Sequence, residues 1–192
     1  MRKRLRSPLL AAAIAFPVAV AVPAASASAH GPAPRPATSA AVRAANSQTI
    51  NVNVTSYGYN DNDDGNGHFG TAVIAYPQIH SQATEDLGTY DQPTTFATDQ
   101  GEFAPGTRIY VPYLQKYFIM EDGCAECSSD WQNGVYHVDL WMGPASSQPE
   151  PALDNCEASI TQSSDIIVNP DPGLPVDTTP MFSNGQCTVV QH

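Results

Sequence analysis

The feature that most constrains the fold is a succession of short strand-like runs with almost no helical periodicity between them. Ile50, Val52 and Val54 alternate with polar residues, which is the pattern of a half-buried strand. Gly, Pro, Asn and Asp separate this run from later ones, and no segment predicts an amphipathic helix of more than two turns. Further strands are predicted at residues 70–76, 94–98, 107–112, 116–121 and 135–142. Many short strands favour an all-β fold, a small closed or nearly closed β-barrel.

Composition divides the 192 residues into four segments. Residues 1–29 combine a basic start, an apolar run too short to span a membrane, and a small-residue cleavage site, as in a secretory signal peptide. Residues 30–48, rich in Pro and Ala, are expected to be a flexible leader. The barrel is expected over residues 49–143, with the proline-rich residues 144–192 as an extension packed on it. We therefore expect a secreted, monomeric protein with one folded domain.

Charge restricts the possible partners. Without the signal peptide, four Lys and Arg residues remain against nineteen Asp and Glu, a formal charge of −15. Such a surface repels phosphate backbones and anionic lipid headgroups, so neither nucleic acid nor a membrane is expected as a partner. A neutral or cationic polymer such as a polysaccharide is easier to accommodate.

Four cysteines in an exported chain predict disulfides. They allow three pairings, among which the sequence cannot choose. We favour Cys124–Cys127, closing a short loop, and Cys156–Cys187, tying down the tail. A zinc site is the less favoured alternative, because Cys156 and Cys187 do not form a second Cys-x-x-Cys pair.

Strand alternation in residues 135–142 separates two sets of side chains. One face carries Tyr136, Val138, Leu140 and Met142, and the other carries Val135, His137, Asp139 and Trp141. Asp139 thus lies between an imidazole and an indole, although strands disfavour aspartate and burying it uncompensated costs several kcal/mol. An acid beside an aromatic plate suits the protonation of a glycosidic oxygen. The alternative is an acid on a solvated strand face.

The order of motifs around this strand resembles a known group of proteins. Asp99 is followed by Pro105-Gly106-Thr107, then Tyr110-Val111-Pro112, the Asp122-Gly123 turn, and Asp139 in a strand. This order is similar to the three-aspartate domain of bacterial cell-wall proteins. The same double-psi β-barrel occurs in lytic transglycosylase A and in family 45 endoglucanases, where a late strand reads His-Phe-Asp. His137-Val138-Asp139 resembles that strand, and the resemblance covers about residues 50 to 143.

The resemblance implies a six-stranded double-psi β-barrel and an acid-assisted, inverting hydrolysis of a cell-wall polysaccharide. Asp139 would be the proton donor and Asp122 a supporting acid. In the endoglucanases the catalytic base is an aspartate of the first strand, but a tyrosine stands at that position in this sequence. Asp61, two residues after Tyr59, is therefore the candidate base. Implied or inferred substrate-binding residues are Trp141, His137, Tyr57, Tyr59 and Asp99.

Other interpretations stay open. Expansin-like relatives keep the acid, lack the base and loosen walls without hydrolysis, whereas a lytic transglycosylase would act on peptidoglycan. The tethered loop from Cys124 to Cys127 departs from the glycine-rich loop of the transglycosylase. A secreted inhibitor or signalling protein with the same barrel fold would not need an acidic residue in a cleft.

Two possible metal sites are not favoured, and neither a metal nor a cofactor is expected. Residues 60–65 match the start of a calcium loop, but Thr71 stands where that loop needs a bidentate glutamate, so a polar turn is favoured. His30 would become N-terminal after cleavage and could chelate copper, but it precedes the proline-rich leader.

Overall fold

The computed structural model describes residues 46–192, so the predicted signal peptide, most of the leader and His30 lie outside the described residues. Six strands form a closed barrel in the order β1-β5-β2-β4-β3-β6. Their bounds are β1 Gln48–Tyr57, β2 Thr94–Thr98, β3 Arg108–Val111, β4 Lys116–Gly123, β5 His137–Trp141 and β6 Gln162–Val168. The mostly-β, six-stranded prediction is confirmed, and the barrel is compatible with the double-psi topology.

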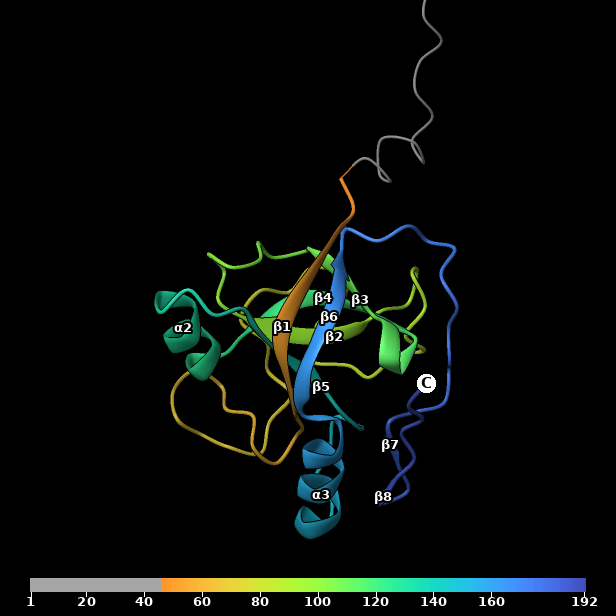
Figure 1. The fold of residues 1–192 in the computed structure, drawn as a ribbon. Helices are drawn as coiled ribbons and strands as arrows, with labels where there is room; N and C mark the ends of the chain where they lie inside the picture. Colours follow the sequence, from red (N-terminus) through yellow and green to blue (C-terminus); the bar gives the residue numbers. More distant parts are fainter. Residues whose placement is uncertain (1–45) are drawn as a thin grey trace, which may run out of the picture. The chain divides into compact units, whose positions relative to one another are not determined.

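The barrel combines two parallel strand pairs with four antiparallel ones. β1 runs parallel to β5 and β2 parallel to β4, while β6 pairs antiparallel with both β1 and β3. β1 and β6 cross the barrel side by side in Figure 1. Alternation fills the interior with apolar side chains, among them Val52, Val54, Phe96, Phe118 and Leu140. β2 is buried along its whole length, as is common for strands covered on both faces.

Helices are more prominent than expected. A 3₁₀ turn, η1 Pro112–Leu114, follows β3, α2 Ala125–Gln132 follows β4, and α3 Glu150–Ile160 joins β5 to β6. The expectation of no helix beyond two turns is wrong for α3, which has 11 residues. Proline lies at the start of this helix, where a backbone N–H has no partner within the helix and its absence costs nothing. The buried face of the helix carries Leu153, Cys156 and Ile160 at helical spacing.

The sixth strand lies beyond the expected end of the barrel at residue 143. β6 consists of residues 162–168, inside the segment that the sequence assigned to the extension, so the barrel spans residues 48–168. Its apolar side chains gather at one end, and its pairing with β1 joins residues more than a hundred positions apart. A half-apolar segment lacks the alternation of a strand, and the pairing with β1 cannot be seen in a local sequence pattern.

Residues 70–76 are not a strand, contrary to the prediction. Side chains of other segments take the hydrogen bonds that a neighbouring strand would make. The Asn62 amide donates to the carbonyls of Thr71 and Val73, and Asp122 accepts from Ala75 N. The next residues are held by Glu121, whose buried carboxylate accepts from the backbone N–H groups of residues 78–80 and pairs with the His80 ring.

The C-terminal residues form an extended tail tied by a disulfide, as predicted. Figure 1 shows this segment running along the barrel to the small hairpin of β7 Phe182–Ser183 and β8 Gln186–Cys187. Hydroxyls of Tyr110 and Tyr117 donate to tail carbonyls at 2.7 and 2.5 Å. Cys187 is bonded to Cys156 of α3, and Cys124 to Cys127 at the start of α2, so both favoured disulfides are confirmed.

Candidate active site

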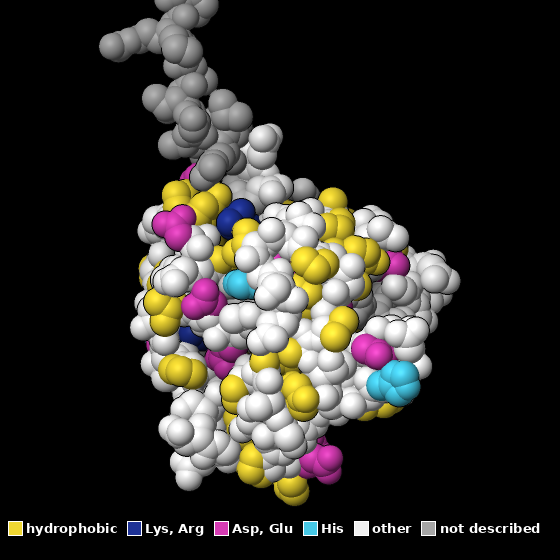
Figure 2. All heavy atoms as spheres, turned by 180° about the vertical axis from the view of Figure 1, so that it is seen from behind, with side chains coloured by type: hydrophobic (Ala, Val, Ile, Leu, Met, Phe, Trp, Pro, Cys, Tyr) yellow, Lys and Arg dark blue, Asp and Glu magenta, His cyan; other side chains and the backbone are white. Residues whose placement is uncertain are grey.

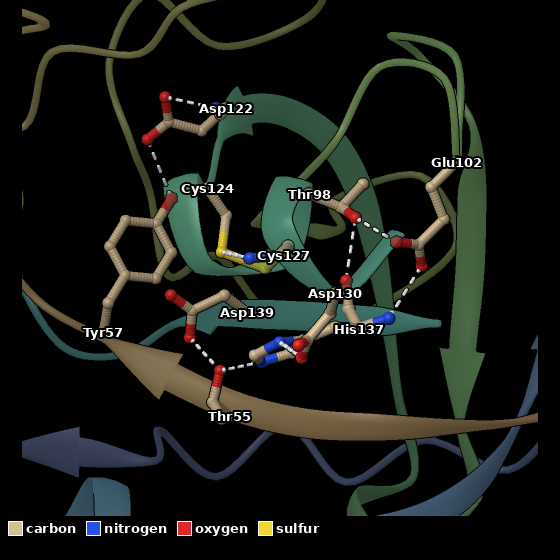
Figure 3. Close-up of a disulfide and its surroundings, with 11 residues drawn as sticks. Thr55, Tyr57, Thr98, Glu102, Asp122, Cys124, Cys127, Asp130, His137 and Asp139 are labelled. Atoms are coloured by element: carbon tan, nitrogen blue, oxygen red, sulfur yellow. Dashed lines mark hydrogen bonds and ion pairs between the residues drawn. A yellow bond between two sulfur atoms is a disulfide. The ribbon is translucent and has the colours of Figure 1, made fainter. Parts of the chain in front are cut away.

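Asp139 lies in β5 opposite Thr55 of β1, and the two are register partners in the parallel pair. The Thr55 hydroxyl donates to Asp139 Oδ1 at 2.7 Å, as Figure 3 shows. Burial, followed by the charges of Asp61, Glu126 and Asp122, raises the pKa of Asp139 to about 7, against the lowering effect of the Thr55 hydrogen bond. The carboxyl is half-buried on the outward face of the strand, while Val138 and Leu140 enter the core. The predicted alternation of faces is therefore confirmed.

His137 connects Thr55 to a second carboxylate. Its Nε2 lies 2.9 Å from Thr55 Oγ1, and its Nδ1 lies 2.9 Å from Asp130 Oδ2 of α2. Figure 3 shows the resulting chain from Asp139 through Thr55 and His137 to Asp130. Since Thr55 gives its hydrogen to Asp139, its oxygen is left as an acceptor for the His137 ring. His137 therefore has a structural role in this cluster, and its substrate contact stays a prediction.

Asp122 does not share a hydrogen bond with Asp139 but is held by Tyr57. The Tyr57 hydroxyl donates to Asp122 Oδ2 at 2.9 Å, and Oδ1 accepts from Ala75 N and Gly123 N. Burial raises the pKa of Asp122, and it raises that of Tyr57 well above its ordinary value, which keeps the phenol protonated as a donor. The charge of Asp122 is one of those that raise the pKa of Asp139, as a supporting acid would.

Asp61 lies in the turn after β1, which ends at Tyr57. The strand does not continue to Asp61, so Tyr57, Tyr59 and Asp61 do not line one strand face. Asp61 Oδ1 instead accepts from Gly58 N at 2.7 Å. Burial raises the pKa of Asp61, and its charge raises the pKa of Asp139.

Glu157 of α3 is a site residue that the sequence analysis missed. Burial raises its pKa to about 8, and the charges of Asp61, Asp154 and Asp139 add to this effect. Its buried Oε1 has no hydrogen-bond partner within residues 46–192. A Cβ on Gly58 would lie 3.2 Å from this atom, so the glycine permits the close approach. The helical spacing of Leu153, Cys156 and Ile160 could have predicted α3 from the sequence. A predicted helix here would have drawn attention to Glu157.

Trp141 is fully buried, at 0% exposure, and cannot offer a sugar plate. Its indole N–H donates to the Gly143 carbonyl at 2.8 Å, and Tyr57 packs against it edge-on with ring centroids 5.2 Å apart. The predicted substrate-binding role of Trp141 is therefore corrected to a packing role. Strand alternation predicted the face correctly, but residues 72–83 cover that face, with Ala72, Ile74 and Ala83 in the same cluster.

Within residues 46–192 no hydrogen bond joins Asp139 to Tyr59 or Asp99, the other predicted substrate contacts. Tyr59 lines two shallow hollows of about 200 and 380 Å³, and Phe69, 68% exposed, borders the smaller one. Asp99 lies at the end of β2, where its carboxylate accepts from Gly101 N, and a hydrogen bond from Ser128 is the main cause that lowers its pKa. Asp122 lines a third hollow of about 320 Å³ beside residues 62–65.

The acidic turn at residues 60–65 is closed by its own hydrogen bonds. Asp63 accepts from Gly65 N and Asp64 from Asn66 N, while the His68 ring pairs with Asp64. Within residues 46–192, no group of three His, Cys, Asp or Glu side chains is arranged to hold a metal ion. Across the same residues, no helix has the length and apolar character needed to cross a bilayer.

The surface is acidic over several elements. On the face in Figure 2, acidic side chains are scattered among polar ones, and Lys and Arg cover only small areas. The described residues contain two such cations, Arg108 and Lys116. Lys116 is buried and donates to the Asp177 carbonyl, whereas Arg108 stacks on the Tyr90 ring.

The fold and these contacts define a closed β-barrel with a cluster of carboxyl groups on its outer face. Residues 49–188 match the family described as the DDB_G0273701 N-terminal domain, and the chain belongs to this family. It is 44% identical over 118 residues to a Dictyostelium discoideum protein, named Uncharacterized protein DDB_G0273701/DDB_G0273221. The match covers 59% of this chain and 51% of the relative, so the chain spans about half the length of the curated relative it matches. No solved structure matches this chain.

Proposed function

We propose that the protein is a secreted, polysaccharide-active double-psi β-barrel in which Asp139 is the proton donor. The observation that carries this proposal is the half-buried Asp139 carboxyl with a pKa of about 7, bonded to Thr55 on the outward face of the barrel. A carboxyl that keeps its proton near neutral pH can protonate the oxygen of a glycosidic bond. The parallel pairs β1–β5 and β2–β4 support the double-psi assignment.

In this mechanism Asp139 gives its proton to the leaving oxygen and becomes a carboxylate. Thr55 donates its hydroxyl hydrogen to the new charge, and the His137 ring, held by Asp130, keeps that hydroxyl in place. Asp139 regains its proton from solvent water after the product leaves.

The attacking water needs a base on the other side of the sugar. Asp61 is our candidate for this base, because its charge raises the pKa of both Asp139 and Glu157. Glu157 is a second carboxyl of the same cluster and is the alternative base once it loses its proton. A carboxyl separation of roughly 6.5–9.5 Å would give inversion of the anomeric centre.

A wall-binding, expansin-like function is the second candidate. One observation favours it, namely that one oxygen of Asp61 is held by Gly58 N in a tight turn. A base that is bonded in this way is less able to activate water. Such a protein would bind the polymer without cutting it. The disulfide loop from Cys124 to Cys127 favours both functions over a peptidoglycan-cleaving transglycosylase.

The test compares the wild-type chain with Asp139→Asn on cellulose, chitosan, mixed-linkage glucan and peptidoglycan. We expect new reducing ends from one neutral or cationic polymer, and a loss of at least about 100-fold in the variant, the scale of general acid catalysis. Asp91→Asn, an exposed loop acid, is the matched control and should keep full activity. Equal product release by Asp139→Asn would overturn the mechanism. Binding by the wild type without release would establish the expansin-like alternative, and anhydro ends would indicate a transglycosylase.

A further inference from the structure

Two aromatic rings meet at the end of α2 and are open to solvent. A turn with Gly134 at φ 77° follows the helix, and Gly134 N and Val135 N donate to the carbonyls of Trp131 and Asp130. This turn brings Tyr136 back against Trp131, with ring centroids 5.2 Å apart. Tyr136 is 37% exposed and Trp131 is half-buried, so together they offer an aromatic surface.

The hydrophobic core holds this aromatic pair in place. Tyr136 also packs against Phe103, a core residue, with centroids 6.0 Å apart and the rings inclined by 31°. Since the core and the turn hold both rings, a ligand that stacks on them does not have to order them first.

The polar edge of Trp131 is open as well. Within residues 46–192 its indole N–H makes no hydrogen bond, whereas the N–H of Trp141 is bonded to Gly143. A Cβ on Gly101 would lie 3.2 Å from Trp131 Nε1 and 3.0 Å from Asp99 Oδ1. The glycine therefore leaves a donor and a carboxylate uncovered side by side, a combination that suits the hydroxyl or amino groups of a sugar.

Three carboxyl groups surround this surface. Asp99 has a lowered pKa and remains charged, Asp130 is partly exposed beside His137, and burial raises the pKa of Glu102 to about 7. The two Lys and Arg residues of the described chain contact other segments. The local charge is therefore negative and favours a cationic group.

Hydrogen bonds connect residues beside the aromatic pair to His137 of the Asp139 cluster. Asp130, the residue before Trp131, bonds the His137 ring, and Glu102 Oε1 accepts from His137 N at 3.0 Å. Tyr136 directly precedes His137, whose ring is linked through Thr55 to Asp139. The aromatic pair therefore adjoins the hydrogen-bonded chain that ends at Asp139.

We propose that Trp131 and Tyr136 form a sugar-binding subsite that receives a glucosamine ring of an amino-sugar polymer. The ring stacks on the aromatic pair, and its ammonium group faces Asp99 and Asp130. This inference rests on the proposed polysaccharide-active function and names the substrate class and the side from which the polymer enters.

The test measures binding of glucosamine oligomers and of glucose oligomers of equal length to the whole exported chain carrying Asp139→Asn, which prevents turnover. Calorimetry gives the affinity, and fluorescence reports on Trp131, since Trp141 is buried. We expect glucosamine oligomers to bind more tightly, with a preference that shrinks at high salt. Trp131→Ala and Tyr136→Ala should each weaken binding roughly tenfold. Trp131→Phe should weaken it less, because it keeps a ring for stacking.

Leu87→Ala removes an exposed apolar side chain elsewhere and should leave binding unchanged. Binding that is the same in Trp131→Ala and Tyr136→Ala would overturn the subsite, even if the wild-type chain cuts the polymer. Equal affinity for glucose and glucosamine oligomers would overturn the amino-sugar preference. If binding depends on both rings but the wild type releases no reducing ends, the subsite stands and the hydrolytic function fails.

Discussion

Thr55 and Asp139 face each other across the parallel pair of β1 and β5, and the threonine hydroxyl lies 2.7 Å from the aspartate carboxyl. Burial raises the pKa of this carboxyl, and the hydroxyl works in the opposite direction. The balance holds the pKa at about 7, close to the pH at which a secreted general acid would work.

Replacing Thr55 by alanine should raise the pKa of Asp139 further. The hydrogen bond favours the carboxylate, and its loss is expected to shift the pKa upward by about one to two units, since hydrogen bonds to charged groups contribute about 1.5–3 kcal/mol. A pH titration of the Asp139 side-chain carbon by NMR measures this shift. Thr55→Ser keeps a hydroxyl and should titrate like the wild type. A lower pKa in Thr55→Ala would contradict this account.

The protein should be more stable at pH 5 than at pH 8. Asp139 and Glu157 have folded-state pKa values of about 7 and about 8, well above those of an unfolded chain. Between these values and the unfolded ones the folded state binds more protons, so stability falls as pH rises through this window. Thermal unfolding from pH 5 to 8 should show a falling Tm. Glu157→Gln should make the Tm less dependent on pH. A Tm that rises with pH would show that the pKa values of these carboxyls are not raised in the folded state.

Gly58→Ala should destabilise the fold and disturb Glu157. The added Cβ would lie 2.9 Å from Leu153 Cδ2, 3.1 Å from the Met142 carbonyl oxygen and 3.2 Å from Glu157 Oε1. Overpacking of this kind costs about 1–3 kcal/mol, measurable by urea unfolding. Gly173→Ala is the matched control, because its Cβ would meet nothing within 4 Å. Equal midpoints for the two variants would argue against a tight contact at Gly58.

The two disulfides should contribute unequally to stability. Cys156–Cys187 closes a loop with a sequence separation of 31 and Cys124–Cys127 one with a separation of 3. By loop entropy, replacing the first pair by serine costs about 3–4 kcal/mol and the second about 2 kcal/mol. Urea unfolding of the two double variants measures both values. A larger loss from the Cys124–Cys127 pair would mean that this loop stabilises by its contacts beside Tyr57 and Trp141 and not by entropy.

Much of the barrel could be predicted from local patterns. The alternation in residues 50–54 and 135–142 identified β1 and β5 and the face that carries His137 and Asp139. The cysteine spacing led to the pairs that are formed. These features depend on side-chain period and loop length, which a sequence displays directly.

Other parts depend on contacts between distant segments. Thr55 stood on the polar side of a predicted strand, but only the β1–β5 register shows that it meets Asp139. Trp141 faces outward as predicted, and its burial comes from a loop that no pattern placed over it. Residues 70–76 had the composition of a strand, yet the side chains of Asn62 and Asp122 take three of their backbone hydrogen bonds.

Closure of the barrel by β6 sets an order of events during biosynthesis. Gln48 pairs with Val168, so β1, the first strand within residues 46–192, has one edge uncovered until β6 has been synthesised. A chain that stopped at residue 143 would keep open edges on both β1 and β3, and open edges recruit strands from other copies.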